Sequence, residues 1–332
     1  MKSAALTHVQ VPEALRRRGI DAVLVFQAGL RHRFRRIEVR DGLLLHGEQG
    51  WGECSPFWDY GATESASWLH AGLEAATRPL PAPVRDLVEV NVTIPVVSPT
   101  QARRLIAASG GCMTAKVKVA DPGSDLRQDC ARVAAARAEL GPEGRIRVDA
   151  NAAWSVDEAV AAVIELDAAA EGLEYVEQPC PSVEELARVR RRITVPVAAD
   201  ESVRRADDPV AVARAGAADI VIVKAQPLGG VARALDVVDR AGLDAVVSSA
   251  LDTSVGLGIG TALAASLPRL GHACGLATIE LFTGDVTTSP LLPEGGALVP
   301  RRVEADQPVH QDVPRALVDR WVERLTAICH EL

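Results

Sequence analysis

The sequence predicts an α/β protein in which parallel strands form a barrel behind a smaller N-terminal region. From about residue 88 onward, short apolar runs alternate with helical patterns at intervals of about 25 to 30 residues, which is typical of βαβ units. Eight such runs are present, the number that closes a (β/α) barrel. Ahead of them, the closely spaced prolines of Arg78–Pro83 cannot continue a helix and mark a boundary between two regions. A doubly wound open sheet is the alternative.

The composition argues against several classes of protein. The 332 residues are 48% hydrophobic and 24% charged, and the net charge of −8 implies no general affinity for nucleic acid or an anionic membrane. The N-terminus lacks the apolar core of a signal peptide, and no apolar run reaches the roughly 20 residues that cross a bilayer. The six cysteines are scattered without a CxxC pair, so we expect reduced thiols in a cytoplasmic protein. A monomer is favoured.

Short strands are predicted in the N-terminal region at Ala22–Phe26, Arg36–Arg40 and Leu43–His46. The dipeptide Asp41-Gly42 predicts a hairpin turn between the second and third of these strands. Gly50–Cys54 is expected to carry the last strand into a loop.

A basic segment, Leu30–Arg36, contains four arginines, at 31, 33, 35 and 36. We interpret it as a loop that closes over an anionic ligand, which makes Arg31 a candidate substrate-binding residue. A solvated edge strand is the alternative interpretation. Thr63–Ala76 is predicted to be helical.

The barrel region contains eight predicted strands: Val88–Val96, Thr114–Val119, Arg145–Asp149, Leu173–Glu177, Val197–Asp200, Ile220–Lys224, Ala245–Ser248 and Ala277–Leu281. The predicted helices between them include Asp125–Leu140, Asp157–Ala170, Val183–Arg191, Pro209–Ala215 and Val231–Ala241. Ser155 and Glu158 have the spacing of a capping box at a helix start. Val313–Ile328 predicts a last helix, carrying Trp321, that leaves the barrel and packs on the first region.

Lysine is rare in this chain. Four of the 36 basic residues are lysine, and three of them, Lys116, Lys118 and Lys224, lie in apolar, strand-like runs. Arginine cannot lose its proton in a working protein, whereas a buried lysine can. Lysines retained at these positions therefore indicate a need for a titratable amine.

Successive predicted strands of the barrel end on charged residues. The third ends at Asp149, the fourth at Glu177, the fifth at Asp200 and the sixth at Lys224. Because the carboxyl ends of barrel strands form the active face, the three carboxylates would converge and repel one another. One such acid is more simply explained as a helix N-cap, but three in succession favour a divalent cation. An all-oxygen site suits Mg²⁺, with Mn²⁺ as a substitute.

Strand geometry places Lys116 and Lys118 on the same face, because side chains alternate along a strand. Lys118 would lie nearer the active face, and Lys224 would lie on the opposite wall. Two amines that flank a substrate bound through a cation suit abstraction of the proton next to a carboxylate. The cation would stabilise the enediolate that forms.

Other chemistries have less support in the sequence. No Walker A loop or GxSxG elbow is present, and we interpret Gly256–Gly260 as a tight strand-to-helix turn that exposes N–H groups to an anion. A Schiff-base lyase would use Lys118 or Lys224 as its nucleophile, but it leaves the three carboxylates unexplained. A binding protein on a decayed barrel would not need the complete set of lysines and carboxylates.

The charged motifs resemble, in their order, those of the enolase superfamily, muconate-lactonizing subgroup. They are Lys-x-Lys at 116–118, Asp-x-Asn at 149–151, Glu-Gln-Pro at 177–179 and Asp-Glu-Ser at 200–202, followed by a single later lysine. The resemblance covers nearly the whole chain, including Gly-Trp-Gly-Glu at 50–53. It implies a (β/α)₇β modified TIM barrel formed by residues 88–305. It also implies an α+β capping domain, formed by residues 1–87 with 306–332 packing back on it.

Within the subgroup, the segment Ser-Ser-Ala-Leu-Asp-Thr-Ser-Val-Gly at 248–256 resembles the seventh-strand segment of the o-succinylbenzoate synthase family. That resemblance implies a Mg²⁺-dependent syn dehydration of 2-succinyl-6-hydroxy-2,4-cyclohexadiene-1-carboxylate to o-succinylbenzoate, a step in menaquinone biosynthesis. The alternative in the same superfamily is racemisation of an N-succinylamino acid. N-acylamino acid racemases tend to carry a Gly-Met-Leu-Glu-Thr type of segment where this chain has the two serines.

The resemblance also implies roles for individual residues. Mg²⁺ would bind Asp149, Glu177 and Asp200. Lys118 would take the α-proton and then help the hydroxyl to leave, while Lys224 would stabilise the enolate by its charge. The supporting residues would be Lys116, Asn151 and Glu201, and the candidate substrate contacts are Ser248, Ser249, Gly256 and Arg31.

Overall fold

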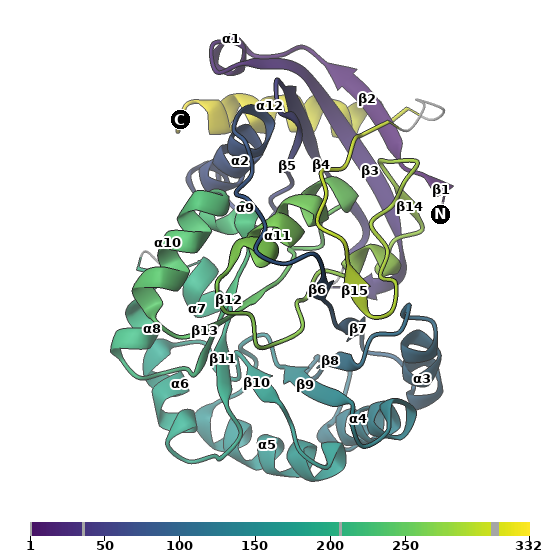
Figure 1. Ribbon diagram of the computed structural model, residues 1–332, viewed down its shortest axis with the longest axis vertical. Helices are drawn as coiled ribbons and strands as arrows, with labels where there is room; N and C mark the ends of the chain where they lie inside the picture. The colour runs from purple at the N-terminus through teal and green to yellow at the C-terminus, as the bar shows by residue number, and fades with distance from the viewer. Residues whose placement is uncertain (1, 35–36, 206–207, 307–311) are drawn as a thin grey trace.

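The computed structural model describes residues 2–34, 37–205, 208–306 and 312–332. An antiparallel sheet with two long helices lies at one end of the molecule, and a curled parallel sheet with helices around its outside lies at the other (Figure 1). The described part of the chain holds no helix long and apolar enough to cross a bilayer.

Seven parallel strands form the barrel wall in the order β13-β12-β11-β10-β9-β8-β7. Their bounds are Val92–Ile94 (β7), Thr114–Lys118 (β8), Arg145–Asp149 (β9), Tyr175–Glu177 (β10), Val197–Ala199 (β11), Ile220–Val223 (β12) and Asp244–Val247 (β13). Cys274 bridges Val90, and Gly275 bridges Ser248, so a short eighth segment closes the ring. The prediction of a (β/α)₇β barrel is therefore confirmed, and the open-sheet alternative is wrong.

Two predicted barrel strands differ from the structure. Val88–Val96 is interrupted: β6 (Val88–Glu89) pairs with β15 (Ala297–Leu298), and β7 alone enters the barrel sheet. Ala277–Leu281 is not a strand, because Thr278–Leu281 forms the 3-10 helix η1. The closing position falls earlier, at Gly275, where a Cβ atom would stand 2.5 Å from Ser248 Oγ and only glycine lets the backbones approach.

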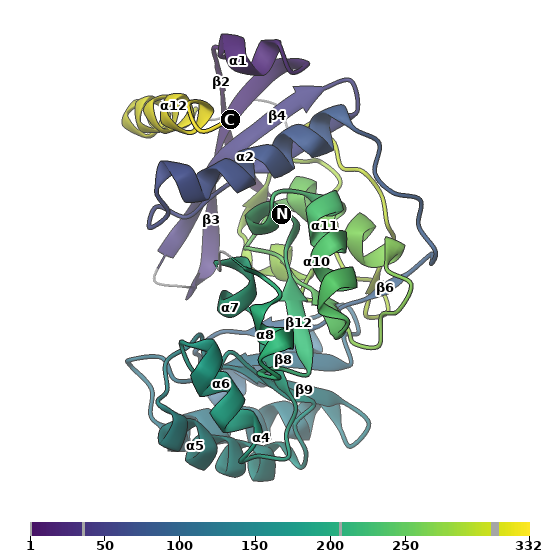
Figure 2. The same cartoon turned by 90° about the vertical axis from the view of Figure 1, so that its left-hand side faces the viewer.

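Helices follow the strands, and most of the longer ones cover the outside of the barrel (Figures 1 and 2). They are Pro99–Ala107 (α3), Leu126–Leu140 (α4), Val156–Ala170 (α5), Val183–Arg190 (α6), Glu201–Arg204 (α7), Ala211–Arg214 (α8), Ala225–Leu228 (α9), Val231–Ala241 (α10) and Ser254–Ser266 (α11). The predicted capping box is present, since Glu158 N donates to Ser155 Oγ and Ser155 N donates to Glu158.

The glycines at 256–260 do not form the predicted turn, because they lie inside α11. These glycines allow neighbouring segments to pack closely against the helix. A Cβ on Gly258 would stand 2.8 Å from the carbonyl oxygen of Arg301, and one on Gly260 would stand 2.8 Å from Leu276 Cδ2. Glycine is costly in a helix interior, so packing has overridden propensity here.

The N-terminal sheet is antiparallel, in the order β2-β3-β4-β5. Its strands are Ala5–Val9 (β2), Ile20–Phe34 (β3), Ile37–Gly47 (β4) and Gly50–Cys54 (β5), with the short elements Lys2–Ser3 (β1), Glu13–Arg16 (α1) and Gly284–Asp285 (β14) nearby. The helix α2 (Ala62–Thr77) packs on β5, and α12 (Arg315–Cys329) packs on α2 and β2. Both helices were predicted, and Trp321 on α12 is fully buried.

The predicted turn at Asp41-Gly42 is wrong, because both residues lie within the continuous strand β4 and pair with β3. A Cβ on Gly42 would stand 2.7 Å from the Phe26 ring, so this glycine permits packing rather than turning. Asp41 accepts hydrogen bonds from the indole nitrogens of Trp58, at 3.0 Å, and Trp321, at 2.7 Å. Gly50–Cys54, predicted as a loop, is also a strand that pairs with β4.

The predicted basic loop at Leu30–Arg36 is wrong for its first five residues, which form the end of β3. Strand pairing extends to Phe34, which faces Ile37 of β4, so this segment is a strand, as in the alternative interpretation, although β3 is an inner strand of its sheet and not an edge. Arg35 and Arg36 lie outside the described residues.

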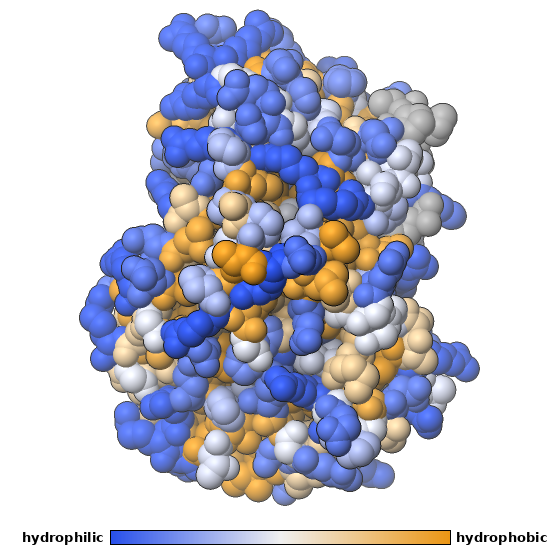
Figure 3. All heavy atoms as spheres, viewed as in Figure 1, coloured by the Kyte–Doolittle hydropathy of each residue, from blue (hydrophilic) through white to orange (hydrophobic). Residues whose placement is uncertain are grey.

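Hydrophilic side chains cover most of the face seen in Figure 3, and apolar side chains gather across its middle. Large apolar residues that are exposed include Val84, Leu87 and Val299. The barrel interior holds a small apolar cluster of its own, formed by Tyr175, Ala198, Ile220, Ile222 and Val246.

Candidate active site

The candidate site lies directly above the apolar cluster in the barrel interior. Side chains alternate along a strand, so a residue two positions after an inward-facing one also faces inward. Glu177 follows Tyr175 in this way, Asp200 follows Ala198, and Lys224 follows Ile222. The register adds a second constraint, because Asp149 pairs with both Lys118 and Glu177 across neighbouring strands.

A pocket opens at this level. It is lined by Phe34, Thr93, Lys116, Lys118, Asp149, Asn151, Asp200, Lys224, Ser248, Ser249, Ala250, Leu251 and Thr278. The predicted lysines, two of the three predicted carboxylates and both predicted serines are therefore brought together at one cavity. Glu177 lies just beneath, bonded to Lys116.

Two lysines and two carboxylates form an ion-pair cluster on one wall. Lys116 Nζ lies 3.1 Å from Asp149 Oδ2 and 3.0 Å from Glu177 Oε1. Lys118 donates to the same Asp149 oxygen and, at 2.9 Å, to Asn151 Oδ1. Asp149 thus receives two ammonium groups, and Lys118 is held at the pocket surface by the Asp149–Asn151 pair.

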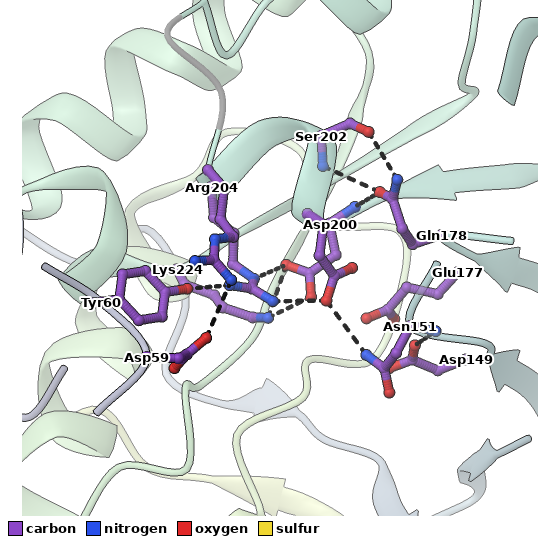
Figure 4. A network of polar contacts seen from close by, with 12 residues as sticks. Asp59, Tyr60, Asp149, Asn151, Glu177, Gln178, Asp200, Ser202, Arg204 and Lys224 are labelled. Atoms are coloured by element: carbon purple, nitrogen blue, oxygen red, sulfur yellow. Dashed lines mark hydrogen bonds and ion pairs between the residues drawn. The ribbon is translucent and has the colours of Figure 1, made fainter. Parts of the chain in front are cut away.

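A second cluster is centred on Asp200, which directly follows β11, the strand next to that of Glu177 (Figure 4). Lys224 Nζ donates to both oxygens of Asp200, at 2.7 and 2.6 Å. Arg204 Nε lies 3.2 Å from Asp200 Oδ1, and Arg204 also binds Glu201, at 2.6 Å, and the hydroxyl of Tyr60. Asp200 is therefore bound to two cations, one of which reaches back to the N-terminal region.

The backbone around Asp200 is fixed by Gln178, which is fully buried. Its side-chain oxygen accepts from the backbone N–H groups of Asp200, at 2.9 Å, and Ser202, at 3.2 Å. Its amide nitrogen donates to Ser202 Oγ at 2.7 Å (Figure 4). The Glu-Gln-Pro and Asp-Glu-Ser motifs therefore depend on each other: the glutamine of one orients the aspartate of the other.

Burial and neighbouring charges determine the pKa values of the three carboxylates. Burial, reinforced by the negative charges of Asp149 and Asp200, raises the pKa of Glu177 to about 7. Burial also favours protonation of Asp149 and Asp200, but the lysines beside them outweigh it and hold both pKa values well below the usual range. Glu177 is thus the carboxylate whose charge is least compensated.

The same two influences shift the pKa values of Lys116 and Lys224 in opposite directions. Burial opposes the charge of Lys116, but Glu177 and Asp149 outweigh burial and raise its pKa. Burial prevails at Lys224 and lowers its pKa despite the attraction of Asp200.

The donor set fits a divalent cation in its chemistry. Asp149, Glu177 and Asp200 present only oxygen donors and are at most 2% exposed, and burial together with the charges of the two aspartates raises the pKa of Glu177. Across the described ranges, no three carboxylate, imidazole or thiol groups already form a metal cage. Lysine ammonium groups share the carboxylate oxygens instead, so binding a cation would require some of these contacts to be exchanged.

Three predicted site residues lie away from the pocket wall. Arg31 is exposed on β3, and Gly256 is buried in α11 with its N–H donated to Glu53. Glu201 lies behind the pocket, where it accepts from Arg204 and, at 3.4 Å, from Asn151.

Several residues of the site were not predicted from the sequence. Phe34 lies on the pocket wall with its ring centroid 5.5 Å from Lys118 Nζ, and Thr93 and Thr278 complete the lining. Arg204 carries a usable signal, because it follows Asp200 by four residues, the spacing of helical neighbours. Phe34 belongs to the basic segment Leu30–Arg36 that was predicted to lie over the ligand, but the prediction selected Arg31 instead. Tyr60 also comes from the N-terminal region, and no local pattern places it at the barrel.

Comparison with known proteins gives consistent results. Residues 99–303 match the model of the enolase C-terminal domain-like family, and residues 25–76 match that of the enolase N-terminal domain-like family. The chain is 54% identical over 304 residues to the o-succinylbenzoate synthase of Thermobifida fusca, covering 91% of this chain and 94% of that protein. It is 49% identical over 305 residues to the o-succinylbenzoate synthase of Mycolicibacterium smegmatis, covering 91% and 93%.

Solved structures show the same fold at lower identity. The L-Ala-D/L-Glu epimerase of Bacillus subtilis aligns with a TM-score of 0.72 at 20% identity, covering 92% of this chain and 98% of that one. The muconate lactonizing enzyme of Pseudomonas putida aligns with a TM-score of 0.69 at 20% identity, covering 91% and 99%.

Proposed function

The chain belongs to the enolase superfamily, and we propose that it acts as an o-succinylbenzoate synthase, a carbon–oxygen lyase. The observation that carries this proposal is the pocket itself, where Lys118 and Lys224 stand on facing walls with carboxylates between them. Identities of 45–54% to synthases, over most of the chain, support the same activity. The racemase alternative is not favoured, because the curated relatives at this identity are named as synthases.

The reaction removes water from 2-succinyl-6-hydroxy-2,4-cyclohexadiene-1-carboxylate. Lys118, as the free amine, takes the proton from the ring carbon that bears the carboxylate, and the electron pair moves into the carboxylate to give an enediolate. The electrons then return to the ring, the neighbouring C–O bond breaks, and the ammonium of Lys118 protonates the departing hydroxyl. One residue can serve both steps because proton and hydroxyl leave from the same face. The ring becomes aromatic, which supplies much of the driving force.

The other residues hold charge in place. Lys224 approaches from the opposite wall, where its positive charge stabilises the enediolate. Lys116 lies below the reacting atoms, where it bridges Asp149 and Glu177 and offsets the repulsion between them. Ser248 and Ser249 contribute hydroxyl groups to the wall beside Lys224, where they can contact the substrate.

Enzymes of this superfamily typically depend on a divalent metal, and here we assign Mg²⁺ to Asp149, Glu177 and Asp200. When bound, the ion supplies positive charge that stabilises the negative charge developing on the substrate carboxylate. The donor chemistry of the three buried carboxylates supports this assignment.

The test is a spectroscopic assay of the cyclohexadiene acid, with and without EDTA. We expect turnover to o-succinylbenzoate, loss of activity in EDTA and recovery on adding Mg²⁺. A rate that is independent of metal, together with trapping of substrate by borohydride, would instead identify a Schiff-base enzyme. Equal efficiency on an N-succinylamino acid would favour the racemase.

A further inference from the structure

One wall of the pocket comes from the segment 248–253, which connects β13 to α11 and begins with the β-bridge of Ser248. Ser248, Ser249, Ala250 and Leu251 face the cavity. Leu251 has a φ of +63°, in the left-handed region that side chains other than glycine rarely adopt. Such a conformation persists only where surrounding contacts determine it.

The first of these contacts comes from Arg40 on β4, which is 3% exposed. Its Nε donates to the carbonyl oxygen of Leu251 at 3.0 Å, and its Nη2 lies 3.3 Å from the carbonyl oxygen of Ala250. The same Nη2 donates at 3.0 Å to the hydroxyl of Ser55, the residue that follows β5, and this contact fixes the guanidinium. The strained residue is therefore held by a group from the N-terminal sheet.

The second contact comes from Glu53 on β5, which is fully buried. One carboxylate oxygen accepts from Thr253 N, at 3.1 Å, from Thr253 Oγ1, at 2.6 Å, and from Gly256 N, at 3.1 Å. The other oxygen accepts from Ser55 Oγ at 2.6 Å. A Cβ on Gly256 would stand 2.9 Å from Glu53, so glycine is needed for α11 to approach this carboxylate.

We propose that Arg40 and Glu53 are positioning residues that set the geometry of the 248–253 wall and thereby the affinity of the pocket for its substrate. The two residues do not line the pocket, and they act only through the wall. This inference rests on the proposed function for the identity of the substrate. It adds that the N-terminal sheet, besides covering the barrel, determines the shape of one side of the site.

The test variant is Arg40→Lys, which keeps the charge but loses the fork that reaches two carbonyls. We expect KM for the cyclohexadiene acid to rise by about tenfold or more, as for loss of a charge-assisted hydrogen bond, with kcat nearly unchanged. The dissociation constant of o-succinylbenzoate, measured by calorimetry, should rise in parallel. Wild-type KM and product affinity in Arg40→Lys would overturn the proposal.

Arg137→Lys is a matched control. Arg137 also donates to backbone carbonyls, those of Ala170, Gly141 and Gly144, each at 2.7 Å, but it lies on α4, away from the 248–253 wall. We expect the control to lose stability without any change in KM. A similar rise of KM in both variants would mean that Arg40 has only a general structural role.

A milder pair of variants covers the case in which Arg40→Lys fails to fold. Thr253→Val removes the hydroxyl bonded to Glu53 and should raise KM, whereas Thr253→Ser keeps the hydroxyl and should restore it. Wild-type KM in Thr253→Val would count against the proposal.

Hydrogen–deuterium exchange separates this inference from the proposed function, because it needs no substrate. Amides of residues 248–256 should exchange faster in Arg40→Lys or Thr253→Val, while β9 stays protected. If the wild-type protein did not dehydrate the acid, the proposed function would fail, and unchanged exchange at 248–256 would separately refute the anchoring of the wall.

Discussion

The two ends of the barrel interior both hold buried ion pairs, but their surroundings shift the pKa of a buried glutamate in opposite directions. At the end away from the pocket, Arg147 lies 2.9 Å from Glu174 and donates at 2.8 Å to the Tyr175 hydroxyl and to the carbonyl oxygen of Ala273. His272 adds a contact to Glu174 at 2.7 Å. At the pocket end, three carboxylates share the buried cations Lys116, Lys224 and Arg204 with Lys118, which reaches the surface of the cavity.

The pKa of one glutamate at each end shows how the two environments differ. Burial would raise the pKa of Glu174, but hydrogen bonds from His272 and the charge of Arg147 outweigh burial and lower it. Burial and the neighbouring aspartates together raise the pKa of Glu177 to about 7. Buried charge alone therefore does not identify a functional site; charge that its neighbours leave uncompensated does.

The largest expected effect comes from Asp200→Asn. The change removes the negative charge between Lys224 and Arg204 and one of the three assigned metal ligands. We expect turnover to be abolished and Mg²⁺ affinity to fall in titration calorimetry, while the circular dichroism spectrum stays native. Unchanged Mg²⁺ affinity would show that Asp200 is not a ligand.

Next in size is Lys118→Arg, which keeps a positive charge but removes the titratable amine. We expect kcat to fall by about 10²- to 10⁴-fold, the usual contribution of a positioned acid–base group. Lys224→Arg should be less damaging, because the role that we propose for Lys224 depends on its charge, which arginine keeps. Near-normal dehydration by Lys118→Arg would exclude Lys118 as the base, and equal loss of α-hydrogen exchange on an N-succinylamino acid in both variants would indicate a two-base racemase.

At the opposite end of the barrel, Arg147→Met should affect stability rather than chemistry. It leaves Glu174 without its main cation, and breaking a buried pair costs about 3–5 kcal/mol. We expect a clear fall in the midpoint of denaturant unfolding, with kcat of the folded fraction within about twofold of wild type, a range small beside that of a lost catalytic group. A large loss of kcat at full folding would contradict the division between the two ends.

The smallest effects, and the sharpest contrast, concern pH in the metal-free protein. Because the folded pKa of Glu177 is raised to about 7, its contribution to stability is most favourable below its ordinary pKa near 4.5 and is lost as pH rises toward 7. The lowered pKa of Glu174 gives the reverse: its contribution is present above its ordinary pKa and is lost as pH falls.

Thermal unfolding across this range should therefore separate the two glutamates. We expect Glu177→Gln to stabilise the metal-free protein above pH 7 and to flatten its pH dependence between about 4.5 and 7. Glu174→Gln should destabilise the protein at neutral pH, and the difference in thermal stability between this variant and the wild type should become smaller at acidic pH. Parallel pH profiles for both variants would remove the distinction.

The sequence was most informative where local geometry alone decides position. Lys116 and Lys118 share a face because strands alternate, and Asp149, Glu177 and Asp200 meet because parallel strands end at one rim. The carboxyl ends of five barrel strands could therefore be assigned without tertiary information.

Residues that other segments bring to the site could not be assigned in this way. Phe34 and Tyr60 reach the site only because the N-terminal region docks on the barrel, a matter of long-range packing. Asp41-Gly42 has the composition of a turn, but Phe26 packing and two indole donors determine its conformation instead. The glycines of α11 were predicted to form a turn for the same reason, because composition does not reveal long-range packing. In the structure they permit Glu53 and Leu276 to approach the helix closely.

The placement of lysine also has a practical consequence for chemical labelling. Lys116, Lys118 and Lys224 have side chains 8%, 13% and 9% exposed and share one cavity, while Lys2 is exposed on β1. Acylating and imine-forming reagents attack neutral amines and spare the permanently protonated guanidinium. Within the part of the chain that the structure describes, such a reagent meets one lysine at the surface and three in the pocket, of which Lys116 is protected by its raised pKa. The rate of inactivation by a small acylating reagent, and its slowing by bound product, would therefore report directly on access to the pocket.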